Sequence, residues 1–208
     1  MREPTPAQSI QLTDQQTLHN TMIVARRHIP LTANRYRCQT GDLWRLLLSA
    51  AARRTTIEAA CADLTGAPDA NTVRGYLTEQ LPPPAIPELE QQWTNLLRSL
   101  IPPWLPARPQ EIAVDFHDQP YYGCDDPDDR DNCVCRGEAR NGTTRFYRCA
   151  TAYSMLHAVR LTLAIVFVKP KMDKVAILSR LLNAVRAAQI SIKCLYADKG
   201  FCSIPVLR

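Results

Sequence analysis

The stretch Glu111-Ile-Ala-Val-Asp-Phe-His-Asp-Gln-Pro-Tyr-Tyr-Gly123 organises the second half of the chain. Its apolar run, 112–114, leads directly into the carboxylate of Asp115. Runs of this kind form buried strands, and the first charged residue usually marks the point where the strand reaches solvent. Pro120 and Gly123 then end the strand. The sequence therefore predicts a buried strand with Asp115 at its tip, where an aspartate serves either as a turn-former or as a metal ligand.

Three further strands and a helix are predicted after this strand. The pattern gives, in order, a polar acidic loop, two strands, a helix capped by Asp173 and a fourth strand, over 124–141, 143–155, 161–168, 173–185 and 190–197. Two hairpins followed by a right-handed helical crossover make the first, third and fourth strands parallel. If the fourth strand lies beside the first, Asp115 and Asp198 meet at one edge of the sheet.

Two carboxylates at such an edge would repel each other unless a cation lay between them. Mg²⁺ or Mn²⁺ suits oxygen ligands of this kind, with water and phosphate completing the coordination shell. Two such ions, about 3.5–4 Å apart, would activate a nucleophile and stabilise the leaving oxygen of a phosphodiester. The alternative for Asp198 is structural, because Asp198-Lys-Gly200 is a good turn by itself.

The first half of the chain is helical and rich in arginine. Between Arg26 and Arg54 lie seven arginines against one acid, Asp42, in a chain of net charge +5. Such an excess suits a polyanion such as DNA, although a solvated helical face gives the same composition. Helices are expected near 14–23, from Asp42, from a Thr55–Glu58 capping box, and after a cap at Asp69 or Asn71.

The last three of these helices form a helix-turn-helix candidate, and an ordinary three-helix bundle is the alternative. The third helix would place Asn71 and Arg74 at base edges in the major groove. The residues predicted to contact DNA are Asn71, Arg74, Thr78, Arg53, Arg54, Arg145 and Arg148, of which the last two could equally lie on the solvent face of their strand. Two proline clusters, around a short amphipathic helix at 89–100, place the domain boundary between 1–104 and 105–208.

Three blocks of the second half resemble a known family. The blocks are Ala113-Val-Asp-Phe-His-Asp-Gln-Pro-Tyr-Tyr-Gly123, Gly142-Thr-Thr-Arg-Phe-Tyr-Arg-Cys-Ala-Thr-Ala-Tyr153 and Leu195-Tyr-Ala-Asp-Lys-Gly-Phe201. In this order they resemble the DDE insertion-sequence transposases with a ribonuclease-H-like core, in the branch common in halophilic archaea and some bacteria. The resemblance covers the helical first half only loosely.

The resemblance implies an α/β protein in which a helical, helix-turn-helix-like region precedes a ribonuclease-H-like mixed sheet with a flanking helix. It implies metal-dependent cleavage and transfer of DNA strands, with double-stranded DNA at the element's terminal repeats as partner. Asp115 and Asp198 match the first and second catalytic, metal-binding aspartates, and Mg²⁺ or Mn²⁺ is the implied cofactor. A homodimer is compatible with this reading.

One departure from the family concerns its third carboxylate, a glutamate on a helix well downstream. No acid follows Asp198 in this sequence. We therefore expect an N-terminal portion of a transposase, with an incomplete sheet, an exposed apolar edge on the fourth strand, and little or no transposition by this chain alone.

Other readings remain open. A helix-turn-helix protein without enzymatic activity is the main alternative. A zinc site at Cys124, Cys133, Cys135 and Cys149 lacks paired Cys-x-x-Cys knuckles, and the aspartates of 125–131 do not fit a calcium loop. His117 and Asp118 could support a metal ligand at Asp115 or shape the turn before Pro120. The polar N-terminus and the short apolar run 161–168 predict a cytoplasmic protein with reduced thiols. The resemblance implies that this protein is nucleoid-associated.

Overall fold

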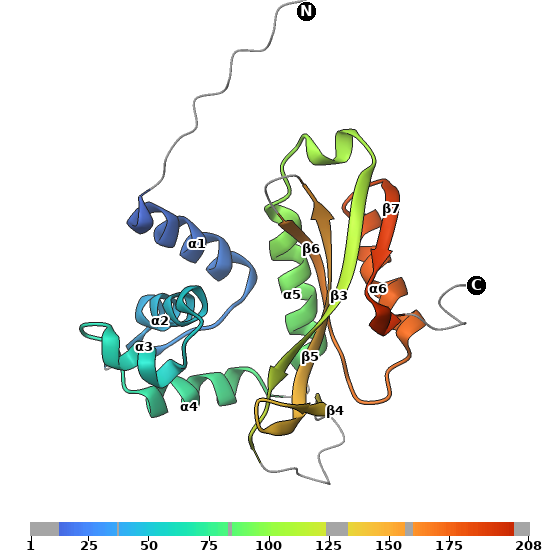
Figure 1. Cartoon of the computed structure of the whole chain (residues 1–208). Coiled ribbons are helices and arrows are strands. Elements are labelled where there is room, and N and C mark those ends of the chain that lie inside the picture. Colours follow the sequence, from blue (N-terminus) through green and yellow to red (C-terminus); the bar gives the residue numbers. More distant parts are fainter. Residues whose placement is uncertain (1–12, 37, 83–84, 124–132, 157–159, 202–208) are drawn as a thin grey trace, which may run out of the picture. The chain divides into compact units, whose positions relative to one another are not determined.

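The computed structural model describes residues 13–36, 38–82, 85–123, 133–156 and 160–201 of a mixed α/β protein, shown in Figure 1. The chain divides into two compact units, Met1–Gln80 and Leu81–Arg208. The sequence predicted a boundary after residue 104, whereas the structure groups helix α5 (Ile86–Ser99) with the sheet that follows. The reason is that α5 packs against a strand of that sheet.

The first unit consists of four helices and a short hairpin. Its elements are α1 (Asp14–His28), β1 (Asn34–Arg35), β2 (Cys38–Gln39), α2 (Thr40–Arg53), α3 (Ile57–Asp63) and α4 (Ala70–Gln80). The predicted helices are present, but α3 begins after Thr56, whose hydroxyl accepts the Ala59 N–H at 3.2 Å. The predicted cap at Thr55 was thus wrong by one residue. Asp69 caps α4 by accepting the Asn71 N–H at 2.9 Å.

The second unit is a five-stranded mixed sheet with two longer helices. Besides α5, its elements are η2 (Leu105–Ala107), β3 (Gln110–Pro120), β4 (Val134–Arg140), β5 (Thr143–Met155), β6 (Arg160–Phe167), α6 (Lys174–Ala187), β7 (Ile192–Ala197) and η3 (Lys199–Phe201). β5 is antiparallel to β3, β4 and β6, and β7 is parallel to β3. The strand order is therefore β7-β3-β5, with β6 on the later half of β5 and β4 on its earlier half.

Two sequence-based predictions about this sheet were wrong, namely Asp115 as the tip of the first strand and the loop at 134–140, whereas the end of that strand at Pro120 was confirmed. β3 does not end at Asp115, because the long strand β5 continues to pair with it as far as Pro120, opposite Phe146. The stretch 134–140 is strand β4 and not a loop. Asn141 and Gly142 have φ values of 51° and 77°, the two positive values of a type I′ turn, and they join β4 to β5 as a hairpin.

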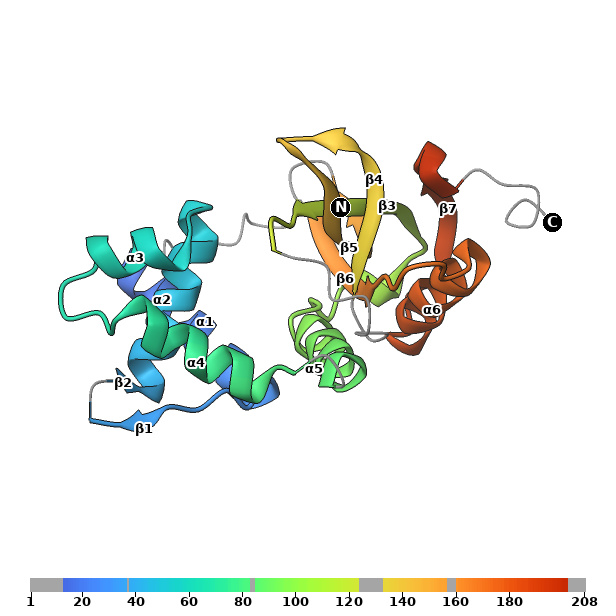
Figure 2. The same cartoon turned by 90° about the horizontal axis from the view of Figure 1, so that it is seen from below.

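The core of this unit lies between the sheet and α6. Ile177, Leu181 and Val185 of α6 are buried in one cluster with Ile112 and Val114 of β3. Figure 2 shows α5 and α6 on one side of the sheet. Alternate side chains of β3 therefore face this core, and Ala113, Asp115 and His117 face the other side.

Glu90 of α5 ties the two helices to the sheet. Its carboxylate accepts the backbone N–H of Phe167 at 2.8 Å and forms an ion pair with Arg180 of α6. Burial raises the pKa of this carboxyl group, against the opposing effects of its two partners. No helix in the described part of the chain combines the length and hydrophobicity that crossing a bilayer requires.

Candidate functional site

Asp115 and Asp198 lie on neighbouring backbone positions of two parallel strands. β7 pairs with β3 in a register that sets Ala113 opposite Tyr196 and Val114 opposite Ala197. The next residue, Asp198, donates its backbone N–H to the carbonyl of Val114 at 3.2 Å. The predicted adjacency of the first and fourth strands is thereby confirmed, and β7 ends where β3 carries Asp115.

The Asp115 side chain is half-buried on the sheet face opposite the core. It forms no ion pair or hydrogen bond with any residue in the described ranges. On β5, Thr151 lies opposite Asp115, and its hydroxyl is 2.9 Å from Nε2 of His117. His117 is two positions along β3 from Asp115 and on the same face, so the imidazole and the Thr151 hydroxyl border the carboxylate.

Asp198 begins a tight turn that is anchored by an aromatic stack. Its carboxylate accepts the Gly200 N–H at 3.3 Å, and its carbonyl accepts the Phe201 N–H at 2.8 Å. Phe201 is fully buried and stacks on Phe116, with ring centroids 4.1 Å apart and planes 7° apart. A Cβ at Gly200 would lie 3.0 Å from the Phe116 ring and 3.1 Å from the Asp198 carboxylate. Asp198 is therefore a turn-former, and its turn is attached to the β3 residue next to Asp115.

Asp118 lies on the opposite face of β3 from Asp115 and His117. Its carboxylate accepts two hydrogen bonds from Arg148, at 2.6 Å to Nε and 3.0 Å to Nη2. These bonds lower the pKa of Asp118 and raise that of Arg148. The structure thus pairs the predicted metal-supporting Asp118 with the predicted DNA contact Arg148.

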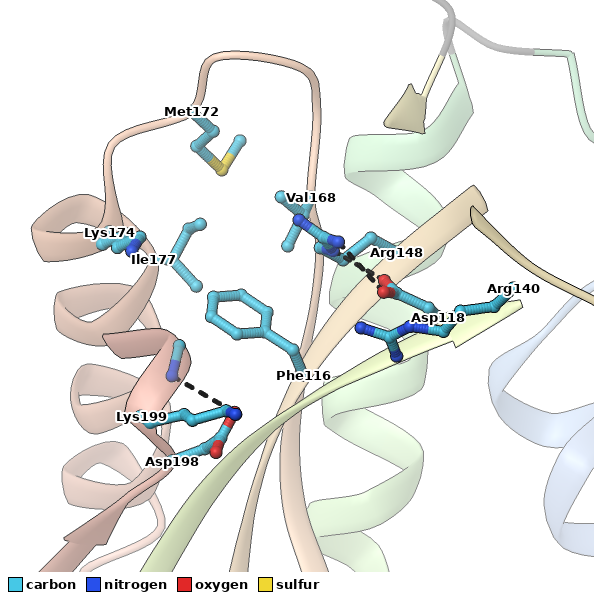
Figure 3. A pocket seen from close by; sticks show the side chains of 11 residues that line it. Phe116, Asp118, Arg140, Arg148, Val168, Met172, Lys174, Ile177, Asp198 and Lys199 are labelled. Atoms are coloured by element: carbon cyan, nitrogen blue, oxygen red, sulfur yellow. Dashed lines mark hydrogen bonds and ion pairs between the residues drawn. The ribbon is translucent and has the colours of Figure 1, made fainter. Parts of the chain in front are cut away.

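A cavity of about 530 Å³ opens beside Asp198. Figure 3 shows Arg140, Arg148, Lys174 and Lys199 around it, with Phe116 at its centre. The sequence reading did not single out Arg140, Lys174 or Lys199. The Asn141-Gly142 dipeptide, a strong hairpin signal, would have placed Arg140 on a strand paired with β5.

Asp115 and Asp198 offer carboxylate oxygens from opposite faces of the sheet: Asp115 lies on the face of His117 and Thr151, whereas Asp198 lines a cavity with Phe116 and Asp118 on the core face. Mg²⁺ in proteins is commonly held by one or two carboxylates, with water and substrate phosphate completing an octahedral shell. Among the described residues, the Asp115 carboxylate has no hydrogen-bond or ion-pair partner, and the Asp198 carboxylate accepts the Gly200 N–H of its own turn. Within the residues that the structure describes, no group of three or more acidic, histidine or cysteine side chains is arranged to hold a metal.

Most of the arginines predicted to contact DNA in the first unit have acidic partners. Arg53 pairs with Asp63 at 2.7 Å. Arg74 forms an ion pair with Glu58 of α3 and donates to the Asn71 side chain at 2.9 Å. Thr78 is exposed on α4, and Arg54 is exposed at the C-terminal cap of α2 in the left-handed conformation. In the second unit, the Arg145 guanidinium lies 5.8 Å from the centroid of the Tyr121 ring.

The cysteines considered for zinc do not share one environment. Cys133 and Cys135 are buried, and the Cys135 thiol donates to the Val168 carbonyl at 3.4 Å. Burial raises the pKa values of the Cys135 and Cys149 thiols, which favours the protonated form over the metal-binding thiolate. Cys124 and the aspartates of 125–131 lie outside the described residues.

Comparison of the chain with protein-family models, curated proteins and solved structures finds no match.

Proposed function

We propose that the second unit is a ribonuclease-H-like core that uses Asp115 and Asp198 in metal-dependent phosphoryl transfer on DNA, as in DDE transposases. The first unit then serves as a helix-turn-helix-like reader of double-stranded DNA. Mg²⁺ or Mn²⁺ is the proposed cofactor, and a phosphodiester is the proposed substrate.

The observation that carries this proposal is the pairing of β7 with β3. The Asp198 N–H reaches the Val114 carbonyl at 3.2 Å, so the two aspartates start from adjacent backbone positions although 82 residues lie between them in the sequence. The order β6-β5-β3-β7, with antiparallel β3, β5 and β6 and a helical crossover to a parallel β7, agrees with the expected core.

Each side chain at this edge has a distinct role in the proposed chemistry. The Asp115 and Asp198 carboxylates would approach the cation from opposite faces of the sheet edge at which β7 ends, and the Phe116–Phe201 stack would fix the distance between the two strands there. The bound ion would supply charge stabilisation and a nucleophile of lowered pKa. His117 and Thr151 are placed to hydrogen bond with water or substrate beside Asp115.

A Mn²⁺ titration of the full chain tests the proposal. Paramagnetic broadening should centre on residues around 113–117 and 197–199. Asp115→Asn and Asp198→Asn should each weaken Mn²⁺ binding by at least about 10-fold, because each removes one of two charged ligands. Glu138→Gln removes an exposed acid on β4 and is the matched control. Equal affinity in all three variants, or broadening centred elsewhere, would refute the shared site.

A non-enzymatic DNA-binding protein is the second candidate function. The compact first unit favours it, since Asn71 and Arg74 lie together on α4 beside α3. Such a protein would bind duplex DNA with an affinity that falls as salt rises, and it would retain that affinity in the Asp115→Asn and Asp198→Asn variants with or without Mn²⁺. Binding of DNA without any response to Mn²⁺ would favour this candidate over the first.

A further inference from the structure

The cavity beside Asp198 has cations on two opposite sides and apolar side chains between them, as Figure 3 shows. Its cationic residues come from four segments: Arg140 from β4, Arg148 from β5, Lys174 from α6 and Lys199 from the turn after β7. Phe116, Val168, Met172 and Ile177 supply the apolar wall, as Figure 3 shows. The volume of about 530 Å³ is in the range of small-molecule sites and exceeds what a single ion needs.

The positive charges of this cavity are only partly compensated. Asp118 is neutralised by its two hydrogen bonds from Arg148. Arg140, Lys174 and Lys199 have no acidic partner in ion-pair contact among the residues that the structure describes. The remaining acid of the lining is Asp198, and Arg140 acts on Asp118 at longer range by lowering its pKa. The lining therefore carries four cations against two carboxylates. The apolar wall lowers the local dielectric constant and strengthens the attraction of these cations for an anion.

We propose that this cavity binds one nucleotide unit of a nucleic-acid strand beside Asp198. Its phosphate lies among Arg140, Lys174 and Lys199, and its sugar lies against Phe116 and Met172. The identity of the ligand as nucleic acid rests on the proposed function, whereas the preference for a phosphate group rests on the lining alone. Lysine and arginine side chains are the usual phosphate contacts of proteins.

Because Asp198 lines the cavity, the affinity of the cavity for phosphate should depend on whether a divalent cation is bound at this carboxylate. Without metal, the Asp198 carboxylate repels a phosphate in the cavity. With a cation bound at Asp198, the same position attracts the phosphate. Binding of phosphate and of metal should therefore be mutually favourable, because coupling between two sites is reciprocal. Asp198→Asn should therefore strengthen phosphate binding in the absence of metal and weaken it in the presence of metal.

The first experiment measures inorganic phosphate binding to the full chain in EDTA, by amide chemical shifts. Lys174→Gln and Lys199→Gln should each weaken binding by about 5-fold, through loss of one nearby charge. Lys171→Gln is the matched control, since it removes the same charge from a residue outside the cavity lining. Equal weakening by all three variants, or shifts centred away from 116, 140, 174 and 199, would overturn the proposal.

The second experiment adds Asp198→Asn and compares ligands. In EDTA this variant should bind phosphate about 3-fold more tightly than the natural chain, through loss of one repulsion, and in Mg²⁺ more weakly. A short DNA duplex should displace the phosphate more effectively than AMP does. Displacement by AMP alone would overturn the nucleic-acid assignment. Lost phosphate binding with intact Mn²⁺ binding would reject this site alone. Phosphate-induced shifts at 140, 174 and 199 without Mn²⁺ binding at Asp115 would reject the proposed function alone.

Discussion

The helical unit and the sheet unit differ in which of their conspicuous cations are paired with acids. In the helical unit, Arg53 and Arg74 each pair with an acid of helix α3, namely Asp63 and Glu58. In the sheet unit, Lys174 and Lys199 line a cavity without an acidic partner in ion-pair contact within the described ranges. The arginine-rich stretch that stands out in the sequence is thus partly neutralised, and the less conspicuous cations are the available ones. Charge density along a sequence does not identify an anion site, because pairing is decided by contacts between elements.

The largest expected effect comes from removing the anchor of the turn that carries Asp198 and Lys199. Phe201→Ala deletes a fully buried ring that stacks on Phe116, and we expect it to destabilise the sheet unit by about 3–5 kcal/mol. Chemical denaturation followed by tryptophan fluorescence measures the loss. Phe201→Leu, which keeps most of the apolar volume, should cost less and is the control. An unchanged midpoint in Phe201→Ala would mean that the turn is not held by the stack.

The next largest effect on the free energy of unfolding is expected from breaking the ion pair between Asp118 and Arg148. Asp118→Asn leaves Arg148 without its bidentate partner and should cost roughly 1–3 kcal/mol at pH 7. Because the folded pKa of Asp118 lies below its unfolded value, this contribution is present above about pH 4 and is lost as pH falls through the folded pKa.

The measurement for Asp118 is the difference in unfolding free energy between the natural chain and Asp118→Asn at pH 7 and at pH 3. The difference should shrink at the lower pH. Glu138→Gln, an exposed acid of the same unit, should show little difference at either pH. A difference for Asp118→Asn that stays constant with pH would contradict the lowered pKa.

The smallest expected effect concerns the arginines of the helical unit. Glu58→Gln and Asp63→Asn each free an arginine from an exposed ion pair, and such pairs contribute about 0–1 kcal/mol to stability. If these arginines meet DNA, the same variants should raise duplex affinity by about 2–5-fold and steepen its salt dependence. Glu79→Gln removes an exposed acid of α4 that forms no ion pair with the described residues, and it tests whether net charge alone produces the gain. Equal gains in all three variants would argue against contacts from Arg53 and Arg74.

Several elements could be predicted because their signals are local. Asp173 caps α6 by accepting the Ala176 N–H at 3.1 Å, and β5 spans Thr143–Met155 as its alternation indicated. The position of β4 could also have been predicted from local sequence, because the Asn141-Gly142 turn indicates a hairpin. Pro120 marked the end of β3 locally, but the pairing of Asp115 within the strand could not be predicted locally. A charged residue continues a strand when a long neighbour such as β5 supplies its hydrogen bonds.

The sequence by itself determined the helices, the strands, their order along the chain and the two aspartates that end up beside each other. Hydrophobic periodicity, caps and turns act over a few residues and can be read directly. The tertiary structure alone decided which charges are paired. It joined Asp118 to Arg148, left Asp115 without an ion pair or hydrogen bond in the described ranges, and gathered Arg140, Lys174 and Lys199 around one cavity. Those relations depend on distances between segments far apart in the chain, which only packing sets.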